Sequence, residues 1–77
     1  MPYVFHLDKI SCLPGWEAGW LSYEFELIHE CTDVAEKNKR LERLLRYLMK
    51  KGVAEYRPGA KSEVTLVQVR KAIAAMI

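Results

Sequence analysis

The sequence contains few of the residues that would commit it to a disulfide scaffold, a metal site or a membrane span. Among 77 residues it has two cysteines and two histidines, and it has no apolar run of the length that crosses a bilayer. Two cysteines allow one bridge at most, so Cys12 and Cys31 are expected as reduced thiols. Residues 1–6 lack the basic-then-apolar layout of a secretory signal. We therefore expect one small cytoplasmic domain over residues 1–77.

Signatures of catalysis and cofactor binding are equally scarce. His6 and His29 would serve as a base beside Cys12 or Cys31 only if the fold brought them together, and nothing in the sequence indicates that it does. Their spacing matches none of the paired layouts that hold zinc. There is no glycine-rich phosphate loop. The sequence predicts no enzyme, no metal, no cofactor and no small-molecule substrate.

Charge is divided sharply along the chain. Residues 1–36 carry seven acidic side chains and one lysine, a net charge of −6, whereas residues 37–77 carry eleven basic and three acidic side chains, a net charge of +8. However the chain folds, an acidic part and a basic part are then available to different partners or to each other.

The first thirty residues show mainly the two-residue period of strands. Residues 3–8 alternate in this way, and residues 11–19 contain Pro14 and two glycines, which predicts a loop. Residues 20–29 are ambiguous. Large side chains alternate with polar ones as in a strand, but a helical stripe also fits, at Trp16, Trp20, Tyr23, Leu27 and Cys31. A helix would leave Leu21, Phe25 and Ile28 on its far side, so a strand is favoured and a helix stays open.

Residues 33–51 give the clearest helical signal. Asp33 offers an N-cap, and good helix formers then continue to Gly52, which ends the helix. At about 100° per residue one face is apolar and is expected to be buried, comprising Val34, Leu41, Leu44, Leu45 and Leu48. The opposite face is basic and is expected to face solvent, comprising Lys39, Arg43, Arg46 and Lys50. Glu36 and Glu42 precede arginines by four residues, which favours ion pairs along this face.

After Gly52 the pattern predicts a hairpin and a closing helix. A strand over residues 53–56 meets Pro58-Gly59, which suit the central positions of a type II turn, and residues 61–65 could return as the second strand. Thr65 can cap a helix in which Leu66, Val69, Ile73 and Met76 or Ile77 recur at helical spacing. The expected fold is α+β, in the order strand, strand, helix, strand, strand, helix, with three or four antiparallel strands covered on one face by two helices.

The basic helix and the hairpin after it resemble the recognition helix and wing of winged-helix DNA-binding domains. The resemblance rests on Lys50-Lys51-Gly52-Val53 and the Pro-Gly tip, and it covers about a third of the chain. Winged-helix domains have two helices before the recognition helix. In this chain the corresponding residues 1–32 are expected to be mostly strand. The sequence therefore does not assign the chain to the family.

Two surfaces carry the functional hypotheses. The leading one is a regulator, inhibitor or adaptor that contacts another protein or a second copy of itself through Trp16, Trp20, Glu24 and Glu26, because tryptophan is enriched at contact hot spots. Small chains of this kind suit phages and mobile elements. The alternative is a nucleic-acid-binding domain that uses Lys39, Arg43, Arg46 and Lys50 with Arg57 and Lys61 of the hairpin. Such binding would be mainly to phosphates, because the exposed helix face has few residues that read bases.

Overall fold

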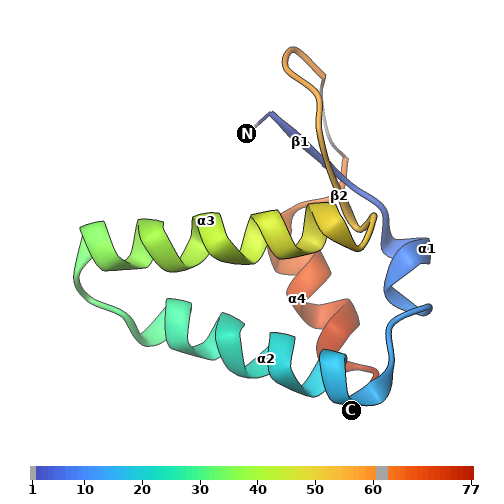
Figure 1. The fold of residues 1–77 in the computed structure, drawn as a ribbon, viewed down its shortest axis with the longest axis horizontal. Helices are drawn as coiled ribbons and strands as arrows, with labels where there is room; N and C mark the ends of the chain where they lie inside the picture. Colours follow the sequence, from blue (N-terminus) through green and yellow to red (C-terminus); the bar gives the residue numbers. More distant parts are fainter. Residues whose placement is uncertain (1, 61–62) are drawn as a thin grey trace.

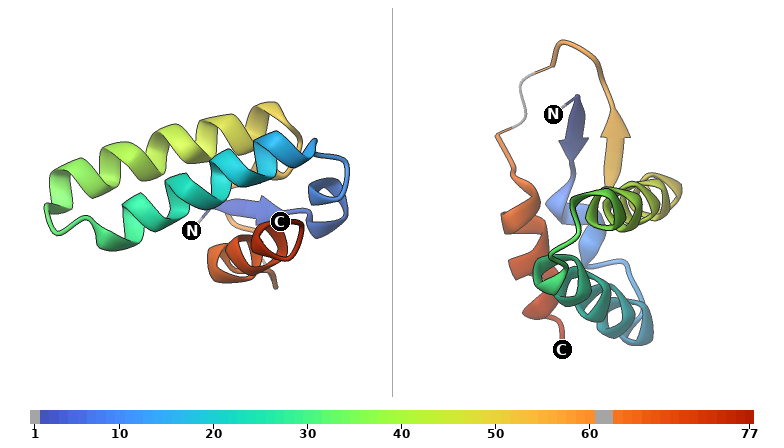
Figure 2. Two further views of the ribbon diagram at one scale, coloured as in Figure 1. Left: turned by 90° about the horizontal axis from the view of Figure 1, so that it is seen from below. Right: turned by 90° about the vertical axis from the view of Figure 1, so that its left-hand side faces the viewer.

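The computed structural model describes residues 2–60 and 63–77, and this part of the chain is mostly helical (Figure 1). Its elements follow one another as β1 (Tyr3–Phe5), α1 (Leu7–Ile10), α2 (Gly15–Glu30), α3 (Val34–Lys50), β2 (Ala54–Tyr56) and α4 (Leu66–Ala74). Helices α2 and α3 run side by side in opposite directions, and α4 and the two strands gather at one end of this pair (Figure 2). The prediction of a three- or four-stranded sheet under two helices is wrong.

The sheet is a two-stranded ribbon that joins distant parts of the chain. Strands β1 and β2 are antiparallel, with Tyr3 opposite Tyr56 and Phe5 opposite Ala54. The predicted strand over residues 3–8 ends at Phe5, and α1 begins two residues later. The predicted hairpin partner of β2 is not a strand at residues 63–65, and residues 61–62 lie outside the described part.

Helix α2 replaces both the predicted loop over residues 11–19 and the favoured strand over residues 20–29. Pro14 caps the helix instead of breaking it, since its carbonyl oxygen accepts hydrogen bonds from the amides of Glu17 and Ala18 at 3.0 and 3.1 Å. Proline suits a helix start because the first amides of a helix have no partner within it. Gly19 then lies inside the helix.

Helices α3 and α4 confirm the two helical predictions. The Asp33 carboxylate accepts hydrogen bonds from the amides of Ala35 and Glu36, and Gly52 follows α3 with φ +80°, a conformation that favours glycine. Thr65 and Gln68 form a capping box at the start of α4. Val34 is the exception on the predicted apolar face. It is exposed because the Val34 end of α3 extends beyond α4 (Figure 1).

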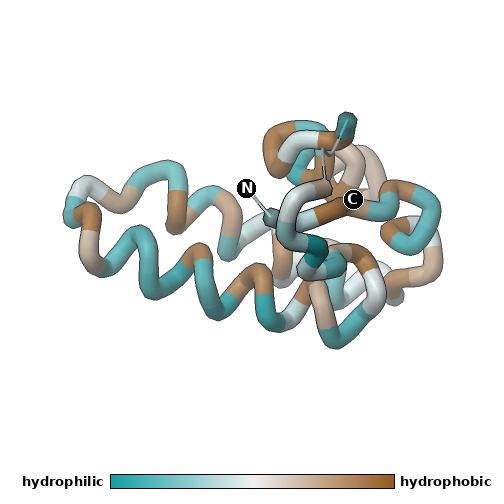
Figure 3. The backbone as a smooth tube through the Cα atoms, turned by 90° about the horizontal axis from the view of Figure 1, so that it is seen from above, coloured by the Kyte–Doolittle hydropathy of each residue, from teal (hydrophilic) through white to brown (hydrophobic). Residues whose placement is uncertain are grey.

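The core is formed where the helix pair meets α4 and the ribbon. Its most deeply buried large side chains come from α2, α3, the residue before β2 and α4, namely Leu21, Leu48, Val53, Val69 and Ile73. Along the α2–α3 pair, polar and apolar segments alternate (Figure 3), as expected of helices that each bury one side.

The type II turn that the sequence predicted at Pro58-Gly59, after β2, is confirmed. The Ala60 amide donates a hydrogen bond to the Arg57 carbonyl at 3.2 Å, and Gly59 has φ +83°, as position i+2 of a type II turn requires. Helices do precede α3, contrary to the prediction for residues 1–32. The wing is nevertheless incomplete in the described residues, because β2 pairs with β1 and not with residues 63–65.

Candidate functional site

The solvent-facing side of α2 carries three large aromatic side chains in a row. Trp16, Trp20 and Tyr23 are 73%, 41% and 58% exposed. Their spacings of four and three residues place them on one side of the helix, and we call them the aromatic stripe. Half-buried Leu27 continues this line by a further turn. Both tryptophans of the protein are therefore at its surface.

The aromatic stripe faces solvent because the other side of α2 forms core. Ala18, Leu21, Phe25 and Ile28 are all buried, and α2 contacts both α3 and α4. These side chains take the positions that a helical core face requires, at spacings of three and four residues. From the sequence, a helix is disfavoured because Leu21, Phe25 and Ile28 would lie opposite the aromatic residues. In the structure that opposite side is the buried one.

One member of the aromatic stripe is anchored to α3. The Trp20 ring meets Tyr47 edge to face, with ring centres 4.9 Å apart and an angle of 62° between the planes. Such a geometry suits the charge distribution of aromatic rings. Trp20 is thus held in place, whereas the more exposed Trp16 and Tyr23 have no aromatic contact in the described residues.

An ion pair with one buried partner, Glu17, fixes the start of α2 to the end of α3. Lys51 Nζ donates to Glu17 Oε1 at 2.8 Å, and Glu17 is only 3% exposed. The Lys51 ammonium lowers the pKa of Glu17, and burial acts in the opposite direction. Burial, together with the Glu17 carboxylate, raises the pKa of Tyr47. This pair was not predicted, because the sequence does not place residues 17 and 51 together.

Glu24 and Glu26 flank the aromatic stripe on opposite sides. Two residues correspond to about 200° around a helix, so the shared acidic strand face that the sequence predicted does not exist. Glu24 is half-buried and Glu26 is exposed. Glu30, four residues after Glu26, is also exposed and extends the same flank. Carboxylates therefore stand on both sides of the aromatic stripe.

The predicted basic face of α3 is confirmed as a solvent-facing surface. Lys39, Arg43, Arg46 and Lys50 are all exposed. Both predicted ion pairs form, from Arg46 to Glu42 at 2.6 Å and from Arg40 to Glu36 at 3.1 Å. Lys39, Arg43 and Lys50 make no ion pair with any residue that the structure describes.

Arg57 and Lys61, the basic residues of the predicted hairpin, add less to this basic face than the sequence suggested. Arg57 Nε donates to Glu55 Oε1 at 3.1 Å, and His6 Nε2 lies 3.2 Å from the other oxygen of Glu55. His6 and then Arg57 lower the pKa of Glu55, against the opposing effect of burial. Arg57 is therefore partly neutralised, and Lys61 lies outside the described residues.

The described residues gather no recognisable catalytic or metal-binding group. No hydrogen bond joins His6 or His29 to Cys12 or Cys31 within residues 2–60 and 63–77. In the same ranges, no three histidine, cysteine or acidic side chains lie close enough together to hold a metal ion. No helix there combines the length and apolar character needed to cross a membrane.

Comparison of the chain with models of protein families, with curated proteins and with solved structures found no match. The functional argument therefore rests on the two surfaces described above, the aromatic stripe of α2 and the basic face of α3.

Proposed function

We propose that this protein is a small cytoplasmic binding protein that docks on another protein through the aromatic stripe of α2 and acts as a regulator, inhibitor or adaptor. The exposure of Trp16, Trp20 and Tyr23 on one helix side is the observation that carries the proposal. Tryptophan and tyrosine are enriched at contact hot spots. Cys12 and Cys31 are both free, and α2 separates them by about 24 Å at 1.5 Å per residue, so no disulfide joins the two ends of this helix.

The size of the aromatic stripe suits a docking surface. Each large aromatic side chain has roughly 200 Å² of surface. With the exposed fractions of Trp16, Trp20 and Tyr23, the aromatic stripe then leaves about 340 Å² of ring surface in water, which is comparable to the largest apolar patch of a typical monomer. Burying it would contribute about 8 kcal/mol at ~25 cal/mol/Å². Association costs about 4–15 kcal/mol, so flanking polar contacts are needed as well.

The flanks indicate the chemistry of the partner. Glu24 stands on one side of the aromatic stripe, and Glu26 and Glu30 stand on the other. None of the three forms an ion pair with a described residue. A complementary partner has an apolar groove bordered by lysine or arginine, because opposite charges at the rim guide association and fix orientation. We therefore infer that the partner presents an apolar groove bordered by basic side chains.

Site-specific photo-crosslinking in the native host tests this proposal. A photoreactive phenylalanine analogue replaces Trp16 in one variant and Tyr56 in a matched control, because Tyr56 on β2 is 57% exposed but lies away from the aromatic stripe. The expected result is a crosslinked protein specific to position 16. The partner identified in this way is then purified. It should bind the Trp16→Ala/Tyr23→Ala variant at least tenfold more weakly than the wild type, and it should bind Tyr56→Ala normally.

Three outcomes would refute the proposal. One is the same crosslinks at both positions, and another is equal affinity for all variants. The third is a crosslink to a second copy of the chain, accompanied by a dimer in light scattering that Trp16→Ala dissociates. That result would assign the aromatic stripe to self-association.

A second candidate function, nucleic-acid binding, is favoured by the unpaired cations Lys39, Arg43 and Lys50 on one exposed helix side. From residue 39 to residue 50 the basic face is about 16 Å long at 1.5 Å per residue, which is long enough to follow phosphates. Titration with duplex DNA at two salt concentrations tests it. Affinity should fall steeply with salt and weaken in Arg43→Ala/Arg46→Ala but not in Lys9→Ala. Absence of binding at about 50 mM salt would exclude this function.

A further inference from the structure

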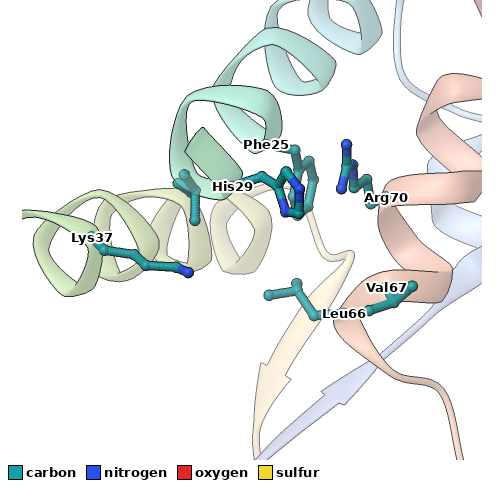
Figure 4. Close-up of a pocket in the computed structure, with 7 residues that line it drawn as sticks. Phe25, His29, Lys37, Leu66, Val67 and Arg70 are labelled. Atoms are coloured by element: carbon teal, nitrogen blue, oxygen red, sulfur yellow. The ribbon is translucent and has the colours of Figure 1, made fainter. Parts of the chain in front are cut away.

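A groove opens between α2, α3 and α4 (Figure 4). Its α2 residues, Phe25, Ile28 and His29, lie on the opposite side of that helix from the aromatic stripe, at about 100° per residue. Its apolar wall consists of Phe25 and Ile28 from α2 and Leu66 and Val67 from α4. Val67 is 61% exposed although it lies beside this apolar surface. The groove therefore offers unfilled apolar contact at the meeting point of three helices.

Every polar side chain that lines the groove, among the residues that the structure describes, is a base. Lys37 comes from α3, Arg70 from α4 and His29 from α2, and no carboxylate of residues 2–60 or 63–77 takes part in the lining. Figure 4 shows the Lys37 ammonium directed into the space between its own helix and α4. Neither Lys37 nor Arg70 forms an ion pair with a residue in the described ranges. Two uncompensated cations thus face one apolar groove.

The size of the groove limits what can occupy it. Its volume is about 170 Å³, whereas sites for cofactors and other drug-sized ligands usually measure about 300–1,000 Å³. The space suits one large apolar side chain. An occupant complementary to the rim also carries negative charge next to that side chain, because an unpaired charge near an apolar contact is costly to desolvate.

We propose that this groove binds an acidic segment of a partner protein, which inserts one large apolar side chain between Phe25 and Leu66 and places its carboxylates near Lys37 and Arg70. The site is separate from the aromatic stripe and from the basic face of α3, so it gives the chain an additional docking point. This arrangement suits an adaptor, which holds two partners at once.

Selection from a random dodecapeptide library displayed on phage, with the full chain as bait, tests the chemistry of the occupant. Enriched peptides should share a large aliphatic or aromatic residue next to aspartate or glutamate. A library that yields no binder, or binders without acidic enrichment, would overturn the proposal.

Affinities of the selected peptides locate their site. Lys37→Glu/Arg70→Glu should weaken binding at least tenfold, while Lys39→Glu/Lys71→Glu makes the same change in net charge on the same two helices outside the groove and serves as the matched control. An equal loss in the control variant would mean that net charge alone governs binding, and would refute the groove.

Two further variants keep the test decisive. Val67→Glu changes an exposed position, so folding is preserved, and it should also weaken peptide binding at least tenfold by adding a carboxylate to the groove. Trp16→Ala should bind the peptides normally. Loss of binding in Trp16→Ala with no effect of Val67→Glu would place the peptides on the aromatic stripe and refute the groove without weakening the proposal for α2.

Discussion

Trp16 and Trp20 lie on the same helix side but should contribute very differently to stability. Trp16 is 73% exposed and Trp20 is 41% exposed. On a side-chain surface of roughly 200 Å², Trp20 buries about 64 Å² more, equivalent to about 1.6 kcal/mol at ~25 cal/mol/Å². Its edge-to-face contact with Tyr47 adds about 0.5–1.5 kcal/mol. Trp20→Ala should therefore cost about 2–3 kcal/mol more than Trp16→Ala.

Urea unfolding followed by far-ultraviolet circular dichroism measures this difference, because secondary structure reports on folding when tryptophan has been removed. The midpoint of Trp20→Ala should fall well below that of Trp16→Ala, at a similar dependence on urea concentration.

Fluorescence gives an independent check, since the chain contains only two tryptophans. Trp20→Phe leaves Trp16 as the single emitter, and iodide should quench it more strongly than it quenches the Trp20 that remains in Trp16→Phe. Equal midpoints, or stronger quenching of Trp20, would refute both the orientation of α2 and the view that Trp16 is kept for binding and not for stability.

Four more variants test the stability of the helices and of their ends. Lys51→Gln should destabilise the fold at neutral pH, because it leaves the Glu17 carboxylate buried without its partner. The difference from the wild type should vanish as the pH falls through the folded-state pKa of Glu17, which lies below the ordinary value; a pH-independent difference in thermal unfolding would contradict this. Gly52→Ala should lower the free energy of unfolding by about 1–2 kcal/mol because of the positive φ. Gly19 lies within α2 with open space around an added carbon, so Gly19→Ala should raise it by about 0.5–1 kcal/mol. Urea midpoints measure both changes. Thr65→Ala should cost about 1 kcal/mol through loss of the capping box, and an unchanged midpoint would count against that role.

The sequence predicted α3 and α4 because their signals are local. Asp33 and Thr65 cap the first turns, Gly52 ends α3, and the apolar side chains recur at one helical period. The basic face followed from the same period. None of these features depends on knowing what the helix packs against.

Helix α2 was missed because it is apolar on both sides. Its buried side carries Leu21, Phe25 and Ile28, and its exposed side carries the two tryptophans and Tyr23. Such a helix has no clear polar face, and the alternation from residue 21 to 27 then imitates a strand. The objection to a helix assumed that its aromatic side would be the buried one, whereas the aromatic residues lie at the surface.

The groove was beyond sequence reasoning for a different reason. Its lining comes from residues 25–29, from Lys37 and from residues 66–70, and no periodicity within one segment reveals that these will meet. Trp16 and Trp20, in contrast, were selected by residue type, and Trp16 also by the loop expected around it, which is part of α2. They lie at the surface as that choice required, and their role stays a prediction.

The ribbon of β1 and β2 has a consequence for how the chain reaches its native state. Residues 3–5 pair with residues 54–56, so the intervening loop is about fifty residues long, whereas α2 and α3 are joined by a short connection. Closing a long loop carries a larger entropic cost than closing a short one. The helical pair should accordingly assemble early in folding, and registry between the two strands should be established late, after the helices have brought their ends together.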